Sequence, residues 1–445
     1  MYKFEDLRNK YKDFIYEKYE IKETNETYEI TFYFNIPKLT TFEPKIIIKK
    51  ENITNKKINK EFLEYLIFNI GLVELISYVK CTCSKNIIIK CGYLSVEQIK
   101  WFKKLYYNGL GEFLYRNNIN IKEEELFNIT TQKEKKEFNI NYKGEGNLIP
   151  VGGGKDSNVT LELLKEENNT CFIINPKGAN IECAKISGNK IITINRIIDK
   201  KIIELNKKGF LNGHTPFSAI VAFTSYLTAY LSNKKYIILS NEDSANQETV
   251  LGTNINHQYS KTYEFECDFN NYTKKYFNIE IKYFSLLRPL TEYQIGMLFS
   301  KIKKYHKTFK SCNLGSKEEN WNWCNKCSKC LFVYIILSPF LYKEELINIF
   351  GKDLYEDETL LKTFKELLGY EETKPWECVG TFEEVRYAVS LLIKKLENKK
   401  LPYLLNYYKE NYPLQLEEKF ETKYNEKNNL DEHFEKIIKE AINNV

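Results

Sequence analysis

The first third of the chain mixes strand-like and helix-like hydrophobic patterns. Residues 28–34 alternate at period two over part of their length and are rich in β-forming side chains, which predicts a strand. Apolar residues recur at helical spacing over residues 61–78. A second helix is predicted over residues 95–107, where Ser95 and Gln98 have the spacing of a capping box. We therefore expect a small α+β domain here.

From Leu148 onward, short apolar runs alternate with helical segments. The runs predict buried strands over residues 148–151, 171–174, 191–194, 236–240 and, less apolar, 279–284. Between them, Thr215 and Pro216 open a predicted helix that ends at Leu231, with Thr215 as its cap and Pro216 at the first helical position. This order predicts a parallel sheet, which binds ligands beyond the carboxyl ends of its strands. The loops after Val151, Ile174 and Leu239 are therefore the expected site.

Length and composition complete the expected architecture. A chain of 445 residues, 43% of them hydrophobic, predicts two or three domains. We expect an α/β protein with an N-terminal α+β domain (residues 1–145), a parallel-sheet domain (146–345) and a helical C-terminal region (346–445). Residues 120–146 begin with a charged stretch and end with glycines, and this composition predicts the linker. The net charge of +6, from 66 basic and 60 acidic side chains, argues against nucleic acid as a partner.

Cysteine content and hydropathy favour a reducing cytoplasm without a membrane partner. The first six residues are charged and lack the apolar core of a signal peptide. The longest apolar run, residues 330–342, is interrupted by Ser338 and Pro339 and is too short to span a bilayer. The chain has 11 cysteines, an odd number, so we read neighbouring cysteines as metal-binding or redox groups rather than disulfides.

A glycine-rich turn follows the first strand of the predicted parallel sheet. It consists of Gly152, Gly153 and Gly154, followed by Lys155, Asp156 and Ser157 and then a helical segment. Glycine lets the backbone approach an anion closely, and a helix N-terminus offers unpaired N–H groups. The turn therefore predicts a phosphate-binding loop, with Asp156 or Ser157 as the helix cap. A glycine-rich turn without a ligand is the alternative.

The loop matches neither of two common nucleotide-binding patterns. In a Walker A loop, the positions of Ile149 and Asp156 would hold glycine and Ser or Thr, and no register fits the dinucleotide fingerprint. The loop resembles instead the PP-loop of the ATP pyrophosphatases, Ser-Gly-Gly-x-Asp-Ser, with Gly152 in place of the first Ser.

Four cysteines form the strongest metal signal. They are Cys312, Cys324, Cys327 and Cys330, and the last three follow a Cys-x-x-Cys-x-x-Cys pattern. Four thiolates at such spacing close a tetrahedral zinc site. An iron–sulfur cluster is a weaker alternative because ferredoxin spacings are not met. Ordinary buried cysteines, or a Cys312 that stays free for chemistry, are further alternatives.

Polar residues directly after the strand that ends near Leu239 are candidates for the cleft. Asn241 and Glu242 lie there, and carboxylates near a triphosphate usually hold Mg²⁺. An acidic surface turn is the alternative. The segment Asn256-His-Gln-Tyr-Ser-Lys261 adds an imidazole, and His257 is an acid/base candidate whose alternative is a structural histidine.

Arg288 precedes a predicted helix in a chain with few arginines. Its planar guanidinium suits a carboxylate or phosphate in bidentate fashion. An ion pair with Glu292 is the alternative.

Seven segments together resemble one family, the UDP-N-acetyl-α-D-muramoyl-L-alanyl-L-glutamate epimerases (MurL). The likeness is closest between about residues 148 and 390, and it rests on residues 151–157, 240–246, 256–261, 286–292, 311–313, 323–330 and 376–380. It implies a PP-loop (HUP-like) sheet and an ATP-dependent isomerase of peptidoglycan precursor synthesis. The substrate implied is a small molecule, UDP-MurNAc-L-Ala-L-Glu, whose terminal L-Glu becomes D-Glu through an acyl-adenylate, with release of AMP and pyrophosphate.

The resemblance also implies site roles. Gly152 to Ser157 and Asn241 would hold the nucleotide, Asp156 and Glu242 would hold Mg²⁺, and Lys261 or Arg288 would bind phosphate or the substrate carboxylate. His257 and Cys312 would be the acid/base groups, although Cys312 then competes with the zinc assignment. Two other functions stay open: another PP-loop enzyme that amidates, thiolates or forms a nitrile, and a zinc-stabilised nucleotide-binding module without catalysis.

Overall fold

The computed structural model describes residues 2–135, 137–250, 252–253, 255–312, 314–315, 322–371, 373–397 and 399–443. Asn313, part of one segment of the family resemblance, lies outside these ranges. One helical stretch, residues 60–79, is long and apolar enough to cross a membrane by composition, and 89% of its most apolar window is buried inside the molecule.

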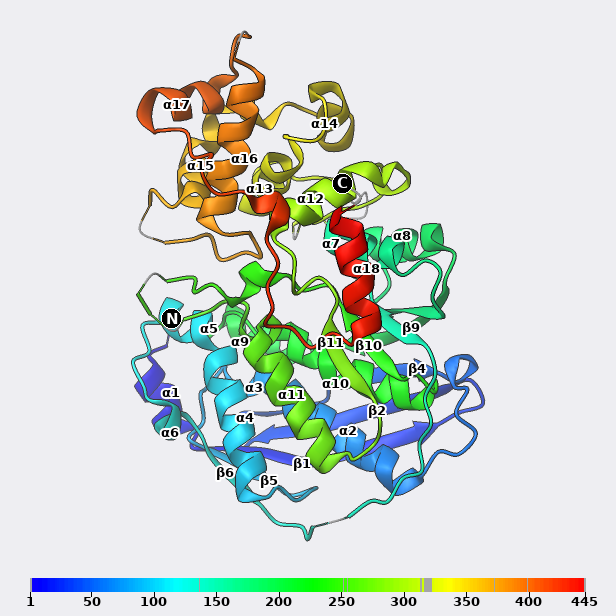
Figure 1. Ribbon diagram of the computed structural model, residues 1–445. Helices are drawn as coiled ribbons and strands as arrows, with labels where there is room; N and C mark the ends of the chain where they lie inside the picture. Colours follow the sequence, from blue (N-terminus) through cyan, green and yellow to red (C-terminus); the bar gives the residue numbers. More distant parts are fainter. Residues whose placement is uncertain are drawn as a thin grey trace.

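A single mixed sheet runs through the molecule in the order β11-β10-β7-β8-β9-β4-β2-β1-β5-β6, and β3 pairs with β2 (Figure 1). Its strands are β1 (Asp13–Glu23), β2 (Thr27–Ile36), β3 (Thr40–Phe42), β4 (Lys45–Lys49), β5 (Asn86–Ile89), β6 (Asn128–Thr131), β7 (Asn147–Pro150), β8 (Asn169–Ile174), β9 (Lys190–Ile197), β10 (Tyr236–Leu239) and β11 (Lys282–Ser285).

Eighteen α-helices among the described residues surround this sheet. The first ten are α1 (Phe4–Lys10), α2 (Lys60–Glu74), α3 (Ile76–Val79), α4 (Val96–Gly109), α5 (Gly111–Arg116), α6 (Glu123–Leu126), α7 (Lys155–Leu163), α8 (Ala179–Ser187), α9 (Lys201–Lys207) and α10 (Phe217–Leu231). The others are α11 (Tyr263–Tyr276), α12 (Glu292–Lys301), α13 (Ser328–Leu337), α14 (Lys343–Phe350), α15 (Leu361–Leu368), α16 (Phe382–Lys395), α17 (Tyr403–Asn411) and α18 (Glu432–Asn443).

The predicted βα alternation is confirmed as a parallel half-sheet. Strands β11, β10, β7, β8 and β9 pair in parallel, and each overlaps the run that its hydrophobic residues predicted. The other half is mixed, because β4 and β2 pair antiparallel while β5 and β6 run parallel to β1. The α/β class is thus confirmed, and the narrower PP-loop (HUP-like) assignment stays a prediction.

The two half-sheets are joined across the predicted linker. Strand β4 from the N-terminal part pairs antiparallel with β9, with Ile46 opposite Arg196. Arg196 also forms an ion pair with Glu74 of α2, with Nε 2.7 Å from Oε2. Backbone pairing therefore ties residues on both sides of position 145 into one sheet.

Alternate residues of the parallel strands enter two separate apolar cores. Leu148, Phe172 and Ile237 belong to a core shared with α2, α4, α10, α11 and the N-terminal strands. Their neighbours Ile149 and Ile238 belong to a second core, built with α7, α12, α13 and the C-terminal helices. Because successive side chains of a strand point to opposite faces, the two cores lie on opposite sides of this half-sheet.

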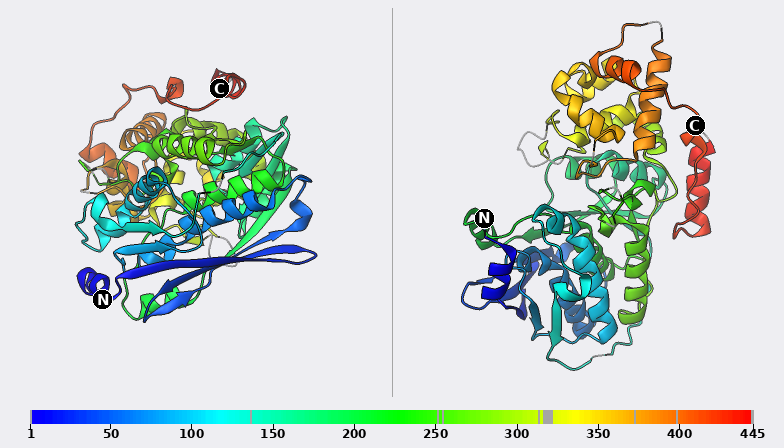
Figure 2. Two further views of the ribbon diagram at one scale, coloured as in Figure 1. Left: turned by 90° about the horizontal axis from the view of Figure 1, so that it is seen from below. Right: turned by 90° about the vertical axis from the view of Figure 1, so that its left-hand side faces the viewer.

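The C-terminal region is helical, and it stacks on one end of the sheet-bearing part (Figure 2). Helix α18 leaves this stack and runs back along the edge of the sheet, where Phe434 packs against Tyr236 of β10 and Phe284 of β11 at ring-centroid distances of 5.3 and 5.0 Å.

Two of the predicted helix caps are wrong, the predicted capping box is confirmed, and the structure shows a second box. The Ser95–Gln98 box opens α4, and a Thr381–Glu384 box opens α16. In α10, Pro216 rather than Thr215 occupies the N-cap position, and no side chain caps that helix. In α7, neither Asp156 nor Ser157 caps; Gly154 takes the N-cap position, because the glycine turn itself leads into the helix.

Candidate active site

The glycine turn is shaped by close contacts on one side and open space on the other. Gly153 has a φ of +80°, and a Cβ there would lie 2.5 Å from the backbone of Ala179 and Asn180, so only glycine fits without displacement. A Cβ on Gly152 would meet nothing within 4 Å. The turn thus packs against the start of α8 and leaves Gly152 facing a cavity.

This cavity, of about 280 Å³, lies at the carboxyl ends of β7 and β10. It is lined by Pro150, Gly152, Gly154, Asp156, Ser157, Leu239, Ser240, Asn241, Glu242, Lys261, Glu292, Lys310, Ser311, Cys312, Lys329 and Cys378. Two of the three predicted loops are therefore confirmed as its walls. The loop after Ile174 contributes no lining residue within the described ranges, so that part of the prediction is wrong.

Lys155 does not line this cavity, but its ammonium pairs with two carboxyl groups that do. Its ammonium contacts the carboxylates of both Asp156 and Glu292, and the side chain is fully buried. Burial alone lowers the pKa of an ammonium, but Asp156 and Glu292 raise the pKa of Lys155 above its ordinary value. Burial raises the pKa of Glu292 to about 8, against the opposing charge of Lys155. In contrast, Lys155 and Lys329 hold the pKa of the partly exposed Asp156 below its ordinary value, against the effect of desolvation.

The helix that follows the turn is anchored to the cysteine-bearing segment. The backbone N–H of Lys155 donates to Ser311 Oγ at 3.3 Å, and a Cβ on Gly154 would lie 2.9 Å from the same oxygen. Ser157 Oγ donates to the carbonyl of Gly154 at 3.1 Å. The first turn of α7 therefore faces the cavity in a fixed orientation, as a phosphate-binding loop requires.

Charges of both signs converge on the cavity. Its lining includes the ammonium-bearing side chains of Lys261, Lys310 and Lys329 and the carboxyl-bearing side chains of Asp156 and Glu242. Glu242 accepts a hydrogen bond from Ser244 at 2.7 Å. Hard oxygen donors of this kind suit Mg²⁺, and the ammonium groups suit phosphate oxygens.

Asn241 lines the cavity, and a hydrogen bond fixes its side-chain amide. Arg288, in contrast, lies behind the residues that line the cavity. Asn241 Nδ2 donates to Ser285 Oγ at 3.0 Å. Arg288 is fully buried and donates to the carbonyls of Glu242 and Lys261 at 2.8 and 2.7 Å. Its ion pair is with Glu266, at 3.2 Å, and not with Glu292 as the sequence alternative supposed. Arg288 therefore positions two cavity loops.

His257 also lies behind the wall, in contact with Glu112 of α5. Its Nδ1 is 2.6 Å from Glu112 Oε2, and its ring lies 4.3 Å from that of His214. Burial lowers the pKa of an imidazole, but hydrogen bonds to Cys378 and Glu112 raise the pKa of His257 to about 9. Burial and the neighbouring His257 lower the pKa of His214 to about 4.

Cys378 is among the cavity residues that sequence reasoning did not select, together with Lys310 and Lys329. Its Sγ lies 2.9 Å from Lys261 Nζ, and Lys329 donates to its carbonyl. Burial raises the pKa of a thiol, yet Lys261, His257 and Lys329 together lower the pKa of Cys378 to about 6. The available signal was the segment Trp376-Glu-Cys-Val-Gly380, which interrupts a helical pattern in a way that the Thr381 cap does not explain.

The four predicted metal-ligand cysteines lie together beside this cavity. The sulfur atoms of Cys312, Cys324, Cys327 and Cys330 are all within 4.8 Å of one another. Neighbouring pairs are separated by 3.5 to 3.9 Å. Four thiol groups at such mutual distances fit a tetrahedral zinc ion, so the residues fit the group that the spacing predicted. Cys312 belongs both to this cluster and to the cavity wall.

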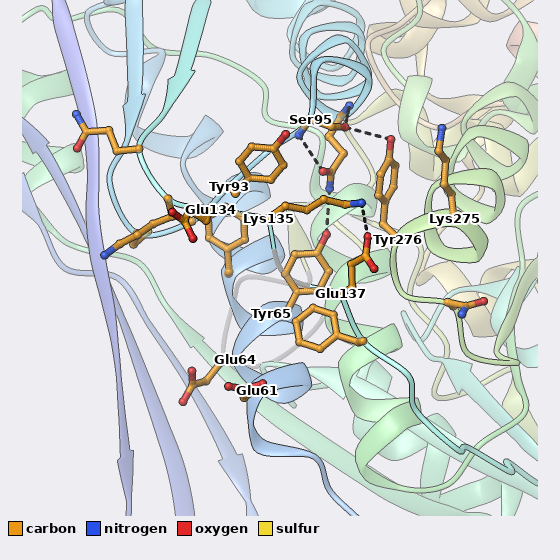
Figure 3. A pocket seen from close by; sticks show the side chains of 18 of the residues that line it. Glu61, Glu64, Tyr65, Tyr93, Ser95, Glu134, Lys135, Glu137, Lys275 and Tyr276 are labelled. Carbon is orange, nitrogen blue, oxygen red and sulfur yellow. Dashed lines mark hydrogen bonds and ion pairs between the residues drawn. The ribbon is translucent and has the colours of Figure 1, made fainter.

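A larger cavity, of about 910 Å³, lies elsewhere and shares no lining residue with the first (Figure 3). Side chains from α2, the start of α4 and the end of α11 surround it, among them Tyr65, Ser95 and Tyr276. Ser95 Oγ and Tyr276 Oη are 3.3 Å apart. Neither the glycine turn nor any of the predicted site residues reaches this cavity, so the smaller one is the candidate active site.

Comparison with known proteins agrees with the sequence resemblance. Residues 5–286 match the model of the MurL N-terminal domain, and residues 308–422 match that of the MurL C-terminal domain. The chain belongs to the MurL family. A relative from Xanthomonas oryzae pv. oryzae, described as UDP-N-acetyl-alpha-D-muramoyl-L-alanyl-L-glutamate epimerase, is 33% identical over 335 residues, which cover 73% of this chain and 74% of the relative.

Two further relatives with the same description are equally similar. One, from a Micromonospora strain, is 34% identical over 73% of this chain and 74% of its own length. The other, from Salinispora tropica, is 34% identical over 71% of this chain and 70% of its own length. No solved structure matches the chain.

Both MurL domain models contribute to the cavity. The N-terminal match contains the glycine turn, Glu242 and Lys261, and the C-terminal match contains Ser311, Cys312 and Cys378. Glu292, which holds Lys155, lies between the two matches. The candidate active site of this MurL-family chain is thus assembled where the two matched regions meet.

Proposed function

We propose that the protein is an ATP-dependent epimerase that converts the terminal L-Glu of UDP-MurNAc-L-Ala-L-Glu to D-Glu during peptidoglycan precursor synthesis. Membership of the MurL family supports the epimerase activity. The observation that carries the ATP-dependent part is the meeting of the glycine turn, three carboxyl groups and three lysines in one cavity.

Activation explains why an epimerase would use ATP. A Cα proton beside a free carboxylate is hard to remove, because the product would carry two adjacent negative charges. In the proposed reaction, a carboxylate oxygen of the glutamyl residue attacks the α-phosphorus of ATP, and pyrophosphate leaves. The resulting mixed anhydride is neutral at the acyl group, so its Cα proton is more acidic and a general base can remove it. After inversion, water cleaves the anhydride and AMP leaves.

Different cavity residues would serve different steps of this reaction. The turn from Gly152 to Ser157 would offer N–H groups to the phosphates, apart from that of Lys155, which Ser311 accepts, and Lys261, Lys310 and Lys329 would offset the negative charge. Asp156 and Glu242 would hold Mg²⁺, which supplies charge neutralisation at the phosphate oxygens when bound. The buried ammonium of Lys155 fixes Asp156 and Glu292 rather than reaching into the cavity.

The cysteine cluster is assigned a structural role in this proposal. Zinc held by Cys312, Cys324, Cys327 and Cys330 would tie the segment after α12 to the start of α13, which carries Lys329 into the cavity. This assignment takes Cys312 out of the acid/base chemistry. The proposed substrates are a nucleotide and a UDP-linked sugar, so the reaction belongs in the cytoplasm, where cysteines stay reduced.

The test incubates the protein with ATP, Mg²⁺ and UDP-MurNAc-L-Ala-L-Glu in D₂O. We expect deuterium at the glutamyl Cα, inversion to D-Glu, and AMP and pyrophosphate formed only when both substrates are present. Pyrophosphate release without inversion or isotope uptake would contradict the proposal and favour another PP-loop enzyme. ATP binding without pyrophosphate release would favour a nucleotide-binding module.

A further inference from the structure

A chain of contacts leads from α5 to the sulfur of Cys378. Glu112 Oε2 lies 2.6 Å from His257 Nδ1, and the same imidazole interacts with Cys378, which raises the pKa of His257 and lowers that of Cys378. Glu112 is held in turn by Arg116, whose Nε lies 2.7 Å from the second carboxylate oxygen. The three groups Glu112, His257 and Cys378 have the order of a carboxylate–imidazole–thiol triad, in which only the last member reaches the cavity.

The charged groups that face Cys378 favour its thiolate form. Lys261 Nζ is 2.9 Å from Sγ, His257 is protonated between two acceptors, and Lys329 adds a third positive charge. His214 shares Glu112 at 3.5 Å but is kept neutral by its buried position, so it does not displace the proton of His257. These charges lower the pKa of the half-buried Cys378 to about 6, which favours its thiolate near neutral pH.

The other ionisable groups of the cavity have partners that leave them poorly suited to accept a proton from carbon. Asp156 and Glu292 share the ammonium of Lys155, so both carboxyl groups are already engaged in a charge contact. Glu242 is held by Ser244 and is needed for the metal in the proposed function. Burial lowers the pKa of an ammonium, but Cys378 and Glu242 raise the pKa of Lys261, which therefore carries a proton already. Cys312 belongs to the cysteine cluster.

We propose that the Cys378 thiolate accepts the Cα proton of the adenylated glutamyl residue on one face, with Glu112 and His257 as its positioning pair. This inference rests on the proposed function. The C–H bond breaks and an S–H bond forms, while the electron pair passes to the enolate of the activated acyl group, beside Lys261. A proton from a donor on the opposite face completes inversion, and the Cys378 thiol returns its proton to water.

The first experiment compares the full-length chain with Cys378→Ala and with a matched control, Cys267→Ala. Cys267 lies on α11, where its sulfur accepts from Asn429, and it does not line the cavity. The readouts are substrate-dependent ATP–pyrophosphate exchange, deuterium uptake at Cα and inversion. We expect Cys378→Ala to keep exchange within about threefold of the unmodified protein and to lose deuterium uptake and inversion at least a hundredfold, the scale of one proton-transfer group. Cys267→Ala should keep all three.

The possible negative results distinguish a failure of the proposed function from a failure of the role of Cys378. If the unmodified protein shows neither pyrophosphate exchange nor inversion, the proposed function falls and this inference falls with it. Suppose that the unmodified protein shows both pyrophosphate exchange and inversion. If Cys378→Ala then takes up deuterium at Cα at a rate within tenfold of the unmodified protein, only the role of Cys378 is overturned. The same holds if Cys378→Ala loses exchange as severely as inversion, or if mass spectrometry finds the substrate acyl group attached to Cys378.

The second experiment needs no substrate and reports on the thiolate directly. The rate of Cys378 alkylation by iodoacetamide, followed by peptide mass spectrometry, should rise with pH around a midpoint of about 6. Lys261→Met removes the nearest cation and should raise this midpoint by at least one pH unit, an expectation based on the size of shifts that a neighbouring charge causes (~1–3 units). A midpoint above pH 8 in the unmodified protein would overturn the inference.

Discussion

At the scale of single residues, the glycine turn separates a position that requires glycine from one that does not. Gly153→Ala should destabilise the protein, because the left-handed backbone alone costs about 1–2 kcal/mol and the new Cβ would press on the backbone of Asn180. Gly152→Ser places a side chain in open space, so stability should change by less than about 0.5 kcal/mol. Urea unfolding of both variants measures the difference, and equal stabilities would contradict the contact geometry.

The same two positions should differ in nucleotide use. Gly152→Ser restores the residue that the PP-loop pattern usually has, and we expect it to keep substrate-dependent pyrophosphate release. Gly153→Ala should lose it, because the turn must move away from α8 to fit the methyl group and the N–H groups of α7 then turn away from the cavity. Release that is equally strong in both variants would argue against phosphate binding at this turn.

Residues of the site differ in how visible they were in the sequence. The turn from Gly152 to Ser157 was predicted because its chemistry and its conformation lie in six consecutive residues. Cys378 was not selected, because its partners Lys261 and His257 are more than a hundred positions away and only the fold brings them together. Arg288 was selected correctly as unusual, but its burial against two backbone carbonyls depends on tertiary packing.

At the scale of elements, the positions of the strands were predicted better than which strands pair with each other. Each run of the parallel half was visible because a doubly covered strand is apolar throughout. The antiparallel pairing of β4 with β9 was not predicted, because it joins segments some 150 positions apart and leaves no local signal. The expected Thr215 cap was wrong by one position: α10 begins at Phe217 instead of Pro216, and no side chain caps it.

The cysteine cluster is the element whose loss should matter most for the C-terminal half of the site. Cys327 occupies the N-cap position of α13, one residue before the helix that carries Lys329 and Cys330. Cys327→Ser should release most of the bound metal and lower stability by more than about 4 kcal/mol, as losses of structural metals do. Metal analysis should find one zinc per chain in the unmodified protein and in a Cys267→Ser control. Iron with labile sulfide, or no metal at all, would contradict the zinc assignment.

At the scale of the whole molecule, the continuous sheet predicts that the N-terminal part and the nucleotide site unfold together. Phe62 of α2 is fully buried, and its ring lies 5.0 Å from that of Tyr230 on α10. Phe62→Ala should therefore cost about 3–5 kcal/mol, the usual range for a buried Phe, although it lies far from the cavity in sequence. The exposed Val96→Ala is the control and should cost less than about 0.5 kcal/mol.

The decisive measurement follows two signals through one urea titration: far-ultraviolet circular dichroism for the whole chain, and binding of a fluorescent ATP analogue for the cavity. Because β4 pairs with β9 and one apolar core contains residues from both α2 and β10, both signals should move to lower urea by the same amount in Phe62→Ala. If the N-terminal part unfolded first while the cavity kept binding the nucleotide, the sheet would join two independent units. The residues from both MurL domain matches that form the cavity would then not depend on the N-terminal strands for their placement.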